Sequence, residues 1–200
     1  MPACRLAAHD LACRRGDRVL FRGLGFALGP GEALHLAGPN GVGKTSLMRI
    51  ATGLLPPLAG SVERAGGIAL LDEHPALDTH LPLGHALGFW RRFDQADRAA
   101  FDRAVETLAL ADLLDVPVRY LSTGQRKRAA LARVMFAGAP LWLLDEPLNG
   151  LDAGSAAAVE ALVGAHCAGG GVALIASHQP FALAGLERLE LAGFAGLEAA

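Results

Sequence analysis

Short apolar runs alternate with turn residues over both ends of the chain. Four runs are almost wholly apolar, which is typical of strands buried on both faces: residues 32–37, 68–71, 141–144 and 172–176. Residues 5–11 and 19–26 predict two further strands around a turn at residues 15–17, and a last strand is expected near residues 186–191. Both ends of the chain are therefore predicted to contribute to sheets.

Helical periodicity replaces this pattern elsewhere. Apolar residues recur at helical spacing behind Lys44, and Gly53 is placed to end that helix. Further helices are predicted at residues 83–93, 97–109, 123–137 and 153–168. Asp94 and Ser122 are the expected N-cap residues of the second and third of these helices, because a short oxygen-bearing side chain can accept from the first free N–H groups.

The alternation of strands and helices predicts an α/β fold with a mostly parallel sheet that helices cover on both faces. The helical stretch from about residue 82 to 138 interrupts this order and is predicted to be an insertion. We expect a single domain over residues 1–200, with a core formed by residues 1–81 and 139–200. A chain of 200 residues is long enough to bury such a core.

Composition disfavours several classes of partner. The net charge of −2 and the pI near 6.4 provide no field that would attract nucleic acid or an anionic membrane. The longest uncharged apolar stretch, residues 134–144, is about half the roughly 20 residues that a spanning helix needs. Three well-separated cysteines and an N-terminus without an apolar signal segment lead us to expect a reduced, cytosolic chain without direct membrane insertion.

A glycine-rich loop follows the strand predicted at residues 32–37. It has the pattern GxxxxGK[ST] and consists of Gly38, Pro39, Asn40, Gly41, Val42, Gly43, Lys44 and Thr45, with Ser46 next. Glycines allow backbone N–H groups to approach a triphosphate, and the following helix adds its positive end. Lys44 is expected to bridge the β- and γ-phosphates, and the Thr45 hydroxyl to bind Mg²⁺. A chance match in a surface turn is disfavoured, because the motif lies between a strand and a helix.

Two carboxylates end a buried strand later in the chain. Residues 141–144 lead directly into Asp145 and Glu146, at the carboxyl end of a strand, where parallel sheets place their ligands. Asp145 is expected to hold the magnesium ion through its water shell. Glu146 is expected to be the base that polarises the attacking water. An ordinary acidic turn is the alternative, and the phosphate loop upstream disfavours it.

The order of these motifs resembles that of the ATP-binding subunits of ABC transporters. Residues 121–125, with the sequence LSTGQ, match the family signature LSGGQ apart from one threonine. Residues 147–152 are similar to the loop that crosses between paired subunits, and His178 is similar to the switch histidine that contacts the γ-phosphate. The resemblance covers nearly the whole chain.

The resemblance implies an ATPase that uses ATP and Mg²⁺ and works as a homodimer with two shared sites. In the family, two subunits pack head to tail, so Ser122, Gly124 and Gln125 would cap the ATP held by the partner's phosphate loop. Lys44, Glu146 and His178 would be the catalytic residues. The resemblance also implies a small N-terminal antiparallel β-subdomain beside the parallel core.

Two positions depart from the family pattern. Arg15 stands where the family often places an aromatic ring on adenine; either its flat guanidinium stacks there, or it is a solvated turn residue. His74 aligns with the family's linking glutamine, near the metal, and the alternative is an ordinary histidine. Because imidazole is a poorer partner than an amide oxygen for Mg²⁺, a functional His74 would make hydrolysis sensitive to pH between roughly 6 and 7.5.

Within the family, residues 13–21, 38–47 and 177–180 are most similar to the ATPase subunits of cytochrome c maturation. This similarity implies a peripheral protein on the cytoplasmic face of the bacterial inner membrane, bound to two copies of a CcmB-like integral membrane subunit. It would energise a haem-handling or export step in c-type cytochrome biogenesis. The alternatives are an ATPase for another exported substrate and a soluble, non-transport ABC ATPase. P-loop kinases and GTPases have no need of LSTGQ.

Overall fold

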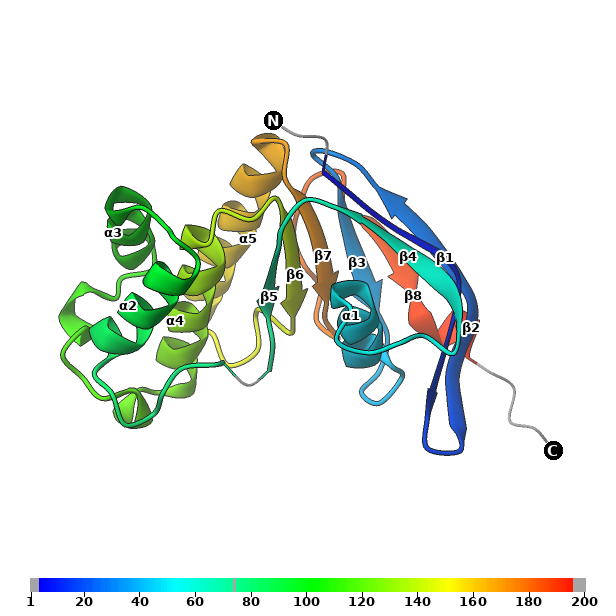
Figure 1. The fold of residues 1–200 in the computed structure, drawn as a ribbon, viewed down its shortest axis with the longest axis horizontal. Coiled ribbons are helices and arrows are strands. Elements are labelled where there is room, and N and C mark those ends of the chain that lie inside the picture. Colours follow the sequence, from blue (N-terminus) through cyan, green and yellow to red (C-terminus); the bar gives the residue numbers. More distant parts are fainter. Residues whose placement is uncertain (1–3, 74, 196–200) are drawn as a thin grey trace.

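The computed structural model describes residues 4–73 and 75–195, which form two sheets and a group of helices to one side (Figure 1). The strands are β1 (Arg5–Arg15), β2 (Arg18–Leu28), β3 (Ala33–Ala37), β4 (Ala59–Ala65), β5 (Ile68–Leu71), β6 (Leu141–Asp145), β7 (Val172–Ala176) and β8 (Glu187–Glu190). The α-helices are α1 (Lys44–Thr52), α2 (Leu83–Phe93), α3 (Arg98–Thr107), α4 (Thr123–Phe136) and α5 (Ala153–Ala168). Short 3-10 helices are η1 (Ala111–Leu113), η2 (Val118–Tyr120) and η3 (Leu191–Phe194).

The larger sheet is parallel throughout, with strand order β5-β6-β7-β3-β8. Its central strands are buried along their whole length, because side chains on both faces pack against other layers. Alternate residues of β6 belong to different cores: Leu141 and Leu143 to one, Trp142 and Leu144 to the other. The α/β fold with a parallel sheet is therefore confirmed.

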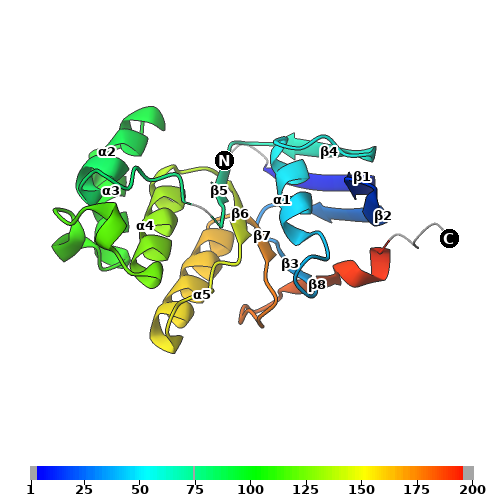
Figure 2. The same cartoon turned by 90° about the horizontal axis from the view of Figure 1, so that it is seen from below.

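Different layers cover the two faces of this sheet. On one face, α1 lies between the parallel strands and the antiparallel sheet β2-β1-β4, as Figure 2 shows. On the other face, α5 and the inserted helices α2, α3 and α4 enclose the second core. The N-terminal antiparallel sheet and the helical insertion both agree with the expected architecture.

Strand β4 is an element that the sequence pattern did not predict. Its residues are polar or small and mostly exposed, so they lack the alternation that marks a half-buried strand. Pairing with β1 defines it, from Arg5 opposite Ala65 to Ala12 opposite Ala59. Gly60 makes the close approach possible, because a Cβ there would collide with the carbonyl oxygens of His9 and Asp10.

The predicted role of Asp94 as an N-cap is wrong. Asp94 is the C-cap residue of α2, where its N–H donates to Trp90 O. Asp97 caps α3 instead, with its carboxylate accepting from the N–H of Ala100. Both aspartates precede α3. The chain turns at Gln95, whose φ is 53°, so Asp97 and not Asp94 stands at the position that caps the first N–H groups of the helix. Ser122 caps α4 as predicted, in a capping box with Gln125.

A histidine fastens the end of α5 to the central sheet. The His166 imidazole stacks on Trp142 of β6, with ring centroids 3.9 Å apart, and its Nε2 donates to Pro140 O at 3.1 Å. Burial lowers the pKa of His166 below its ordinary 6.5, against the raising effect of hydrogen bonds to Pro140 and Val172. The fold therefore favours the neutral imidazole.

Replacing this ring tests the arrangement. We expect His166→Phe to be about 1 kcal/mol less stable than the parent near neutral pH, because stacking is kept while a hydrogen bond is lost. Since the unfolded chain takes up a proton near pH 6.5 that the folded ring resists, the parent loses stability at His166 as pH falls below 6.5. The variant lacks this loss, whereas the effect of His35 is common to both proteins. Urea unfolding across this range should show that the difference in unfolding free energy between parent and variant narrows in acid. A difference that is independent of pH would contradict the effect of burial on the His166 pKa.

Candidate functional site

The phosphate loop and the paired carboxylates meet at the carboxyl edge of the parallel sheet. The loops after β3, β6 and β7 surround a cavity of about 350 Å³. Its lining residues are Leu20, Asn40, Gly41, Gly43, Lys44, Thr45, Ser46, Glu73, Lys127, Asp145, Glu146, Asn149 and His178. Sequence segments more than one hundred positions apart thus form one site, because parallel strands all finish at the same edge.

The phosphate loop wraps around the first turn of α1. Gly43, at a φ of 115°, is the N-cap residue, and a Cβ there would press on Leu20 and Phe21 of β2. The Lys44 side chain is 6% exposed, and its Nζ donates to Gly38 O at 2.8 Å and Pro39 O at 3.3 Å. The ammonium group therefore lies against the first two carbonyl oxygens of the loop.

Glu146 is the most constrained residue of the site. Its φ is 48°, in the left-handed region, and its N–H donates to Ala176 O at 2.8 Å. Its carboxylate accepts from the backbone N–H of His178 at 3.2 Å and from His178 Nδ1 at 2.9 Å. Lys44 Nζ lies 3.5 Å from the same carboxylate. The structure thus brings together Lys44, Glu146 and His178, the three residues expected to be catalytic.

Asp145 is almost fully buried beside Thr45. Its Oδ1 has no hydrogen-bond partner among the described residues. Burial raises the pKa of Asp145 above its ordinary value, a hydrogen bond with the Thr45 side chain opposes this, and the Glu146 charge adds to it. An unpartnered, buried carboxylate oxygen next to a hydroxyl fits the oxygen ligands that Mg²⁺ and its water shell require.

Several residues of this site were not predicted from the sequence. The buried polar side chains of the described chain are His35, Lys44, Lys127, Asp145 and Ser177. Lys44, Lys127 and Asp145 line the cavity, and Ser177 follows β7 beside it. His35 of β3 donates from Nε2 to Ser177 O at 3.2 Å, and burial lowers its pKa. A polar residue within the apolar run 32–37 was the available signal for His35. Lys127 lies in the basic run after LSTGQ, and Asn149 lies in the loop 147–152, but neither position was predicted to face the chain's own phosphate loop.

The signature lies in a second cavity of about 380 Å³, which shares no lining residue with the first. Its lining residues are Ser122, Thr123, Gly124, Gln125, Arg128, Gly150, Leu151, Asp152 and Ser155. Ser122 Oγ accepts from the Gln125 N–H, while the Gln125 side chain accepts from the Ser122 N–H. The signature and the loop at residues 147–152 therefore form one surface, apart from the chain's own phosphate loop.

The two unusual positions have different outcomes. Arg15 is exposed at the β1–β2 turn and does not line the cavity, although its charge lowers the pKa of Cys13, which burial raises. Its stacking on adenine stays a prediction. His74 lies outside the described residues, so its proposed role near the metal is not tested.

No helix within residues 4–73 and 75–195 has the length and apolar character needed to cross a bilayer.

Comparisons with known proteins agree with this geometry. Residues 21–149 match the model of the family described as "ABC transporter". The chain is 59% identical, over 97% of its length and 99% of the relative, to the cytochrome c biogenesis ATP-binding export protein CcmA of Novosphingobium aromaticivorans. It is 54% identical, over 92% of its length and 95% of the relative, to the protein of the same name from Sphingopyxis alaskensis.

Among solved structures, a putative ABC transporter ATP-binding protein from Pyrococcus furiosus has the same fold. The TM-score is 0.84 at 21% identity, covering 96% of this chain and all of that one. The order of motifs, the two separate cavities and these matches lead to one conclusion. The chain belongs to the ATP-binding proteins of the ABC transporter family, in the group that carries the name CcmA.

Proposed function

We propose that this ATPase energises a haem-handling or export step in c-type cytochrome biogenesis, as the nucleotide-binding subunit of a membrane transporter. The observation that supports this most strongly is the 59% identity, over nearly the full length of both chains, to a protein named for ATP-binding export in cytochrome c biogenesis. By the same analogy, the protein would act peripherally on the cytoplasmic face of the bacterial inner membrane.

The site geometry supports a division of labour in ATP hydrolysis. We assign binding of the triphosphate to residues 38–46, with Lys44 as the cation that meets the β- and γ-phosphates. The Glu146 carboxylate would take a proton from the attacking water, and a base of this kind contributes about 10²–10⁴-fold to the rate. His178 donates to that carboxylate from two nitrogens, which fixes its direction.

Thr45 and Asp145 are the residues that would hold Mg²⁺ together with the nucleotide. The buried Asp145 Oδ1 without a partner supports this assignment. When bound, the ion would neutralise charge that develops on the phosphate oxygens. In the protein itself, burial raises the pKa of Asp145 and the hydrogen bond with the Thr45 side chain opposes that rise, so a bound cation would favour the ionised carboxylate.

The dimer is supported by the separation of the two cavities. Ser122, Gly124 and Gln125 line a surface cavity at a helix start, where N–H groups favour an anion, yet they line no part of their own chain's nucleotide cavity. Two copies packed head to tail would complete each nucleotide site with the other's signature. We therefore propose a homodimer with two shared ATP sites.

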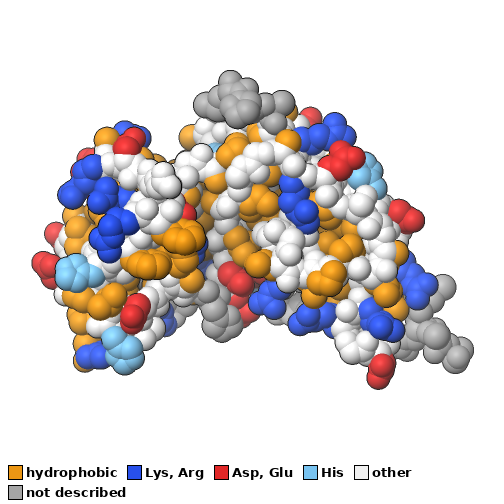
Figure 3. Space-filling view, viewed as in Figure 1, with side chains coloured by type: hydrophobic (Ala, Val, Ile, Leu, Met, Phe, Trp, Pro, Cys, Tyr) orange, Lys and Arg blue, Asp and Glu red, His pale blue; other side chains and the backbone are white. Residues whose placement is uncertain are grey.

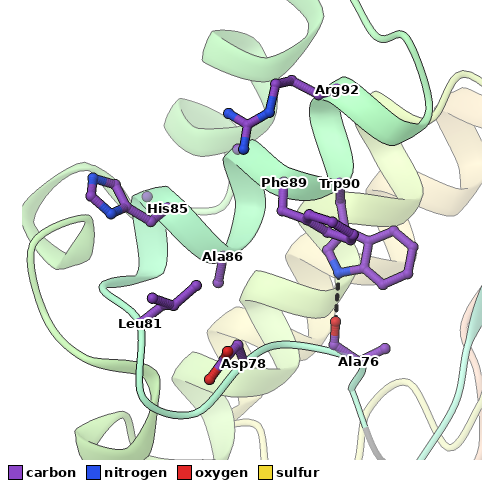
Figure 4. Close-up of a pocket in the computed structure, with 10 residues that line it drawn as sticks. Ala76, Asp78, Leu81, His85, Ala86, Phe89, Trp90 and Arg92 are labelled. Carbon is purple, nitrogen blue, oxygen red and sulfur yellow. Dashed lines mark hydrogen bonds between the residues drawn. The ribbon is translucent and has the colours of Figure 1, made fainter.

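An apolar pocket on the inserted helices is the proposed contact with the membrane subunit. A cavity of about 590 Å³ opens between α2 and the segment that precedes it, and Leu81, Phe89 and Trp90 line it (Figure 4). Phe89 is 51% exposed and Phe93 68% exposed, and Figure 3 shows hydrophobic side chains gathered on this side of the molecule. Exposed apolar clusters of this kind mark contact sites.

This pocket is also close, along the chain, to the nucleotide. Glu73 lines the nucleotide cavity and Ala76 lines the apolar pocket, where its carbonyl accepts from Trp90 Nε1. An apolar helical segment of a CcmB-like subunit is the proposed occupant, with an acidic side chain facing Arg92 at the rim. A movement of the membrane subunit at the pocket would then be transmitted to the nucleotide cavity over the short stretch of sequence between Ala76 and Glu73.

Removal of the metal tests the role of Asp145. We expect hydrolysis to require Mg²⁺, and Asp145→Asn to raise the Mg²⁺ concentration for half-maximal activity about tenfold, because a charged ligand oxygen is lost. Asp102→Asn, on an exposed ion pair with Arg98, is the control and should match the parent. An unchanged Mg²⁺ requirement in Asp145→Asn would exclude Asp145 as a metal-holding residue.

Glu146→Gln tests both the base and the dimer. With millimolar Mg-ATP, we expect turnover to fall by about 10²-fold or more and the chain to elute as a dimer, because ATP is bound but not consumed. Adding Lys44→Ala to this variant should restore the monomer, since the phosphate loop loses its cation. A monomer of Glu146→Gln at saturating Mg-ATP would contradict the shared sites.

Phe89→Glu tests the contact with the membrane subunit. We expect co-purification with a co-expressed CcmB-like subunit to fall about tenfold or more, because a charge enters an apolar pocket. ATP hydrolysis by the isolated chain should stay within about twofold of the parent. Leu58→Glu is the matched control, because Leu58 is 48% exposed and lies outside the pocket. Equal recovery of the partner with both variants would rule out this pocket.

A further inference from the structure

Lys127 is a buried cation that the scheme above does not use. It is 7% exposed, lies in the second turn of α4, and lines the nucleotide cavity. Its Nζ donates to the main-chain carbonyl of Glu146 at 3.0 Å, and the same carbonyl accepts from the Asn149 N–H at 3.2 Å. Together with Ala176 O, which accepts from the Glu146 N–H, Lys127 holds the Glu146 backbone from both sides.

A lysine is an unexpected choice for a position that only needs packing. Burial lowers the pKa of Lys127, and the charges of Asp145, Glu146, Glu73 and Asp72 oppose that shift. A leucine or methionine would fill the same volume without the cost of removing an ammonium group from water. What the ammonium adds is a charge-assisted hydrogen bond to one carbonyl, on a residue whose φ of 48° needs outside support.

Helix α4 connects this bond to the other cavity. Its first turn carries Gly124 and Gln125, which line the signature cavity, and Lys127 follows two residues later. At a rise of about 1.5 Å per residue, the backbone positions of Gln125 and Lys127 are offset by roughly 3 Å along the axis of a rigid helix. A shift of the helix start must therefore move Lys127, and with it the carbonyl of Glu146.

We propose that Lys127 is a positioning residue that ties Glu146 of each chain to that chain's own signature helix. A nucleotide held by the partner and seated on the signature would then set the Glu146 carboxylate of the opposite site. The two sites would be coupled through one hydrogen bond per chain. This inference rests on the proposed homodimer with shared sites.

Steady-state ATP hydrolysis by the full chain tests the coupling. For the parent, a Hill coefficient above 1 in ATP is expected. For Lys127→Met, which keeps the volume and removes the donor, we expect kcat to fall about tenfold or more, the half-saturating ATP concentration to stay within about threefold, and the Hill coefficient to fall to about 1. Lys127→Arg keeps a charged donor and should retain kcat within about threefold together with the cooperativity.

Arg133→Met is the matched control for loosening of α4. Arg133 is a half-buried cation of the same helix, its pKa is lowered by burial, and it stacks on Trp90 at 3.3 Å from the ring centroid, away from the nucleotide cavity. It should keep the parental Hill coefficient. If Lys127→Met does not fold, Lys127→Gln, a shorter neutral donor, replaces it with the same expected loss of cooperativity.

Three results would overturn the proposal: parental kcat and cooperativity in Lys127→Met, an equal loss in Arg133→Met, or a parent with a Hill coefficient of 1. Failure of the dimer is recognised separately, because Glu146→Gln would then elute as a monomer. A dimer that forms normally in Glu146→Gln, combined with unchanged cooperativity in Lys127→Met, rejects the role of Lys127 and leaves the dimer intact.

Discussion

The site depends on one kind of interaction. Buried side-chain donors hold main-chain carbonyls at the carboxyl edge of the parallel sheet. The loops after β3, β6 and β7 leave the ladder there, so their carbonyl oxygens need other partners. Lys44 holds Gly38, Lys127 holds Glu146, and His35 holds Ser177. The loop after β3 is thereby fixed by its own lysine, and the loops after β6 and β7 by side chains from α4 and β3.

Glu146 shows what this arrangement achieves. A residue in the left-handed region is strained, and the surrounding hydrogen bonds must over-determine it. Its N–H, carbonyl and carboxylate are each bound, by Ala176, Lys127 and His178 respectively. The carboxylate is therefore aimed before any reaction starts, which lowers the cost of organising the site in the transition state.

The helical insertion connects the nucleotide to two outer surfaces. Helix α4 starts in the signature cavity and bonds to Glu146 through Lys127, while Glu73 of the nucleotide cavity and Ala76 of the apolar pocket are three positions apart in the sequence. Both connections are short, and the helix is rigid. In the proposed complex, a partner chain at the signature and a membrane subunit at the pocket would therefore both act on the nucleotide cavity.

The sequence by itself determined the elements whose signals are local. The phosphate loop, the buried strands and the Ser122 cap each follow from a few adjacent residues, so motif and periodicity were enough to place them. Tertiary structure alone decided β4, which exists through pairing with β1, and the choice of Asp97 over Asp94 as a cap. It also decided that Lys127 bonds to the carbonyl of Glu146 and His35 to that of Ser177, because burial and hydrogen-bond partners come from segments far apart in the chain, and no local pattern records them.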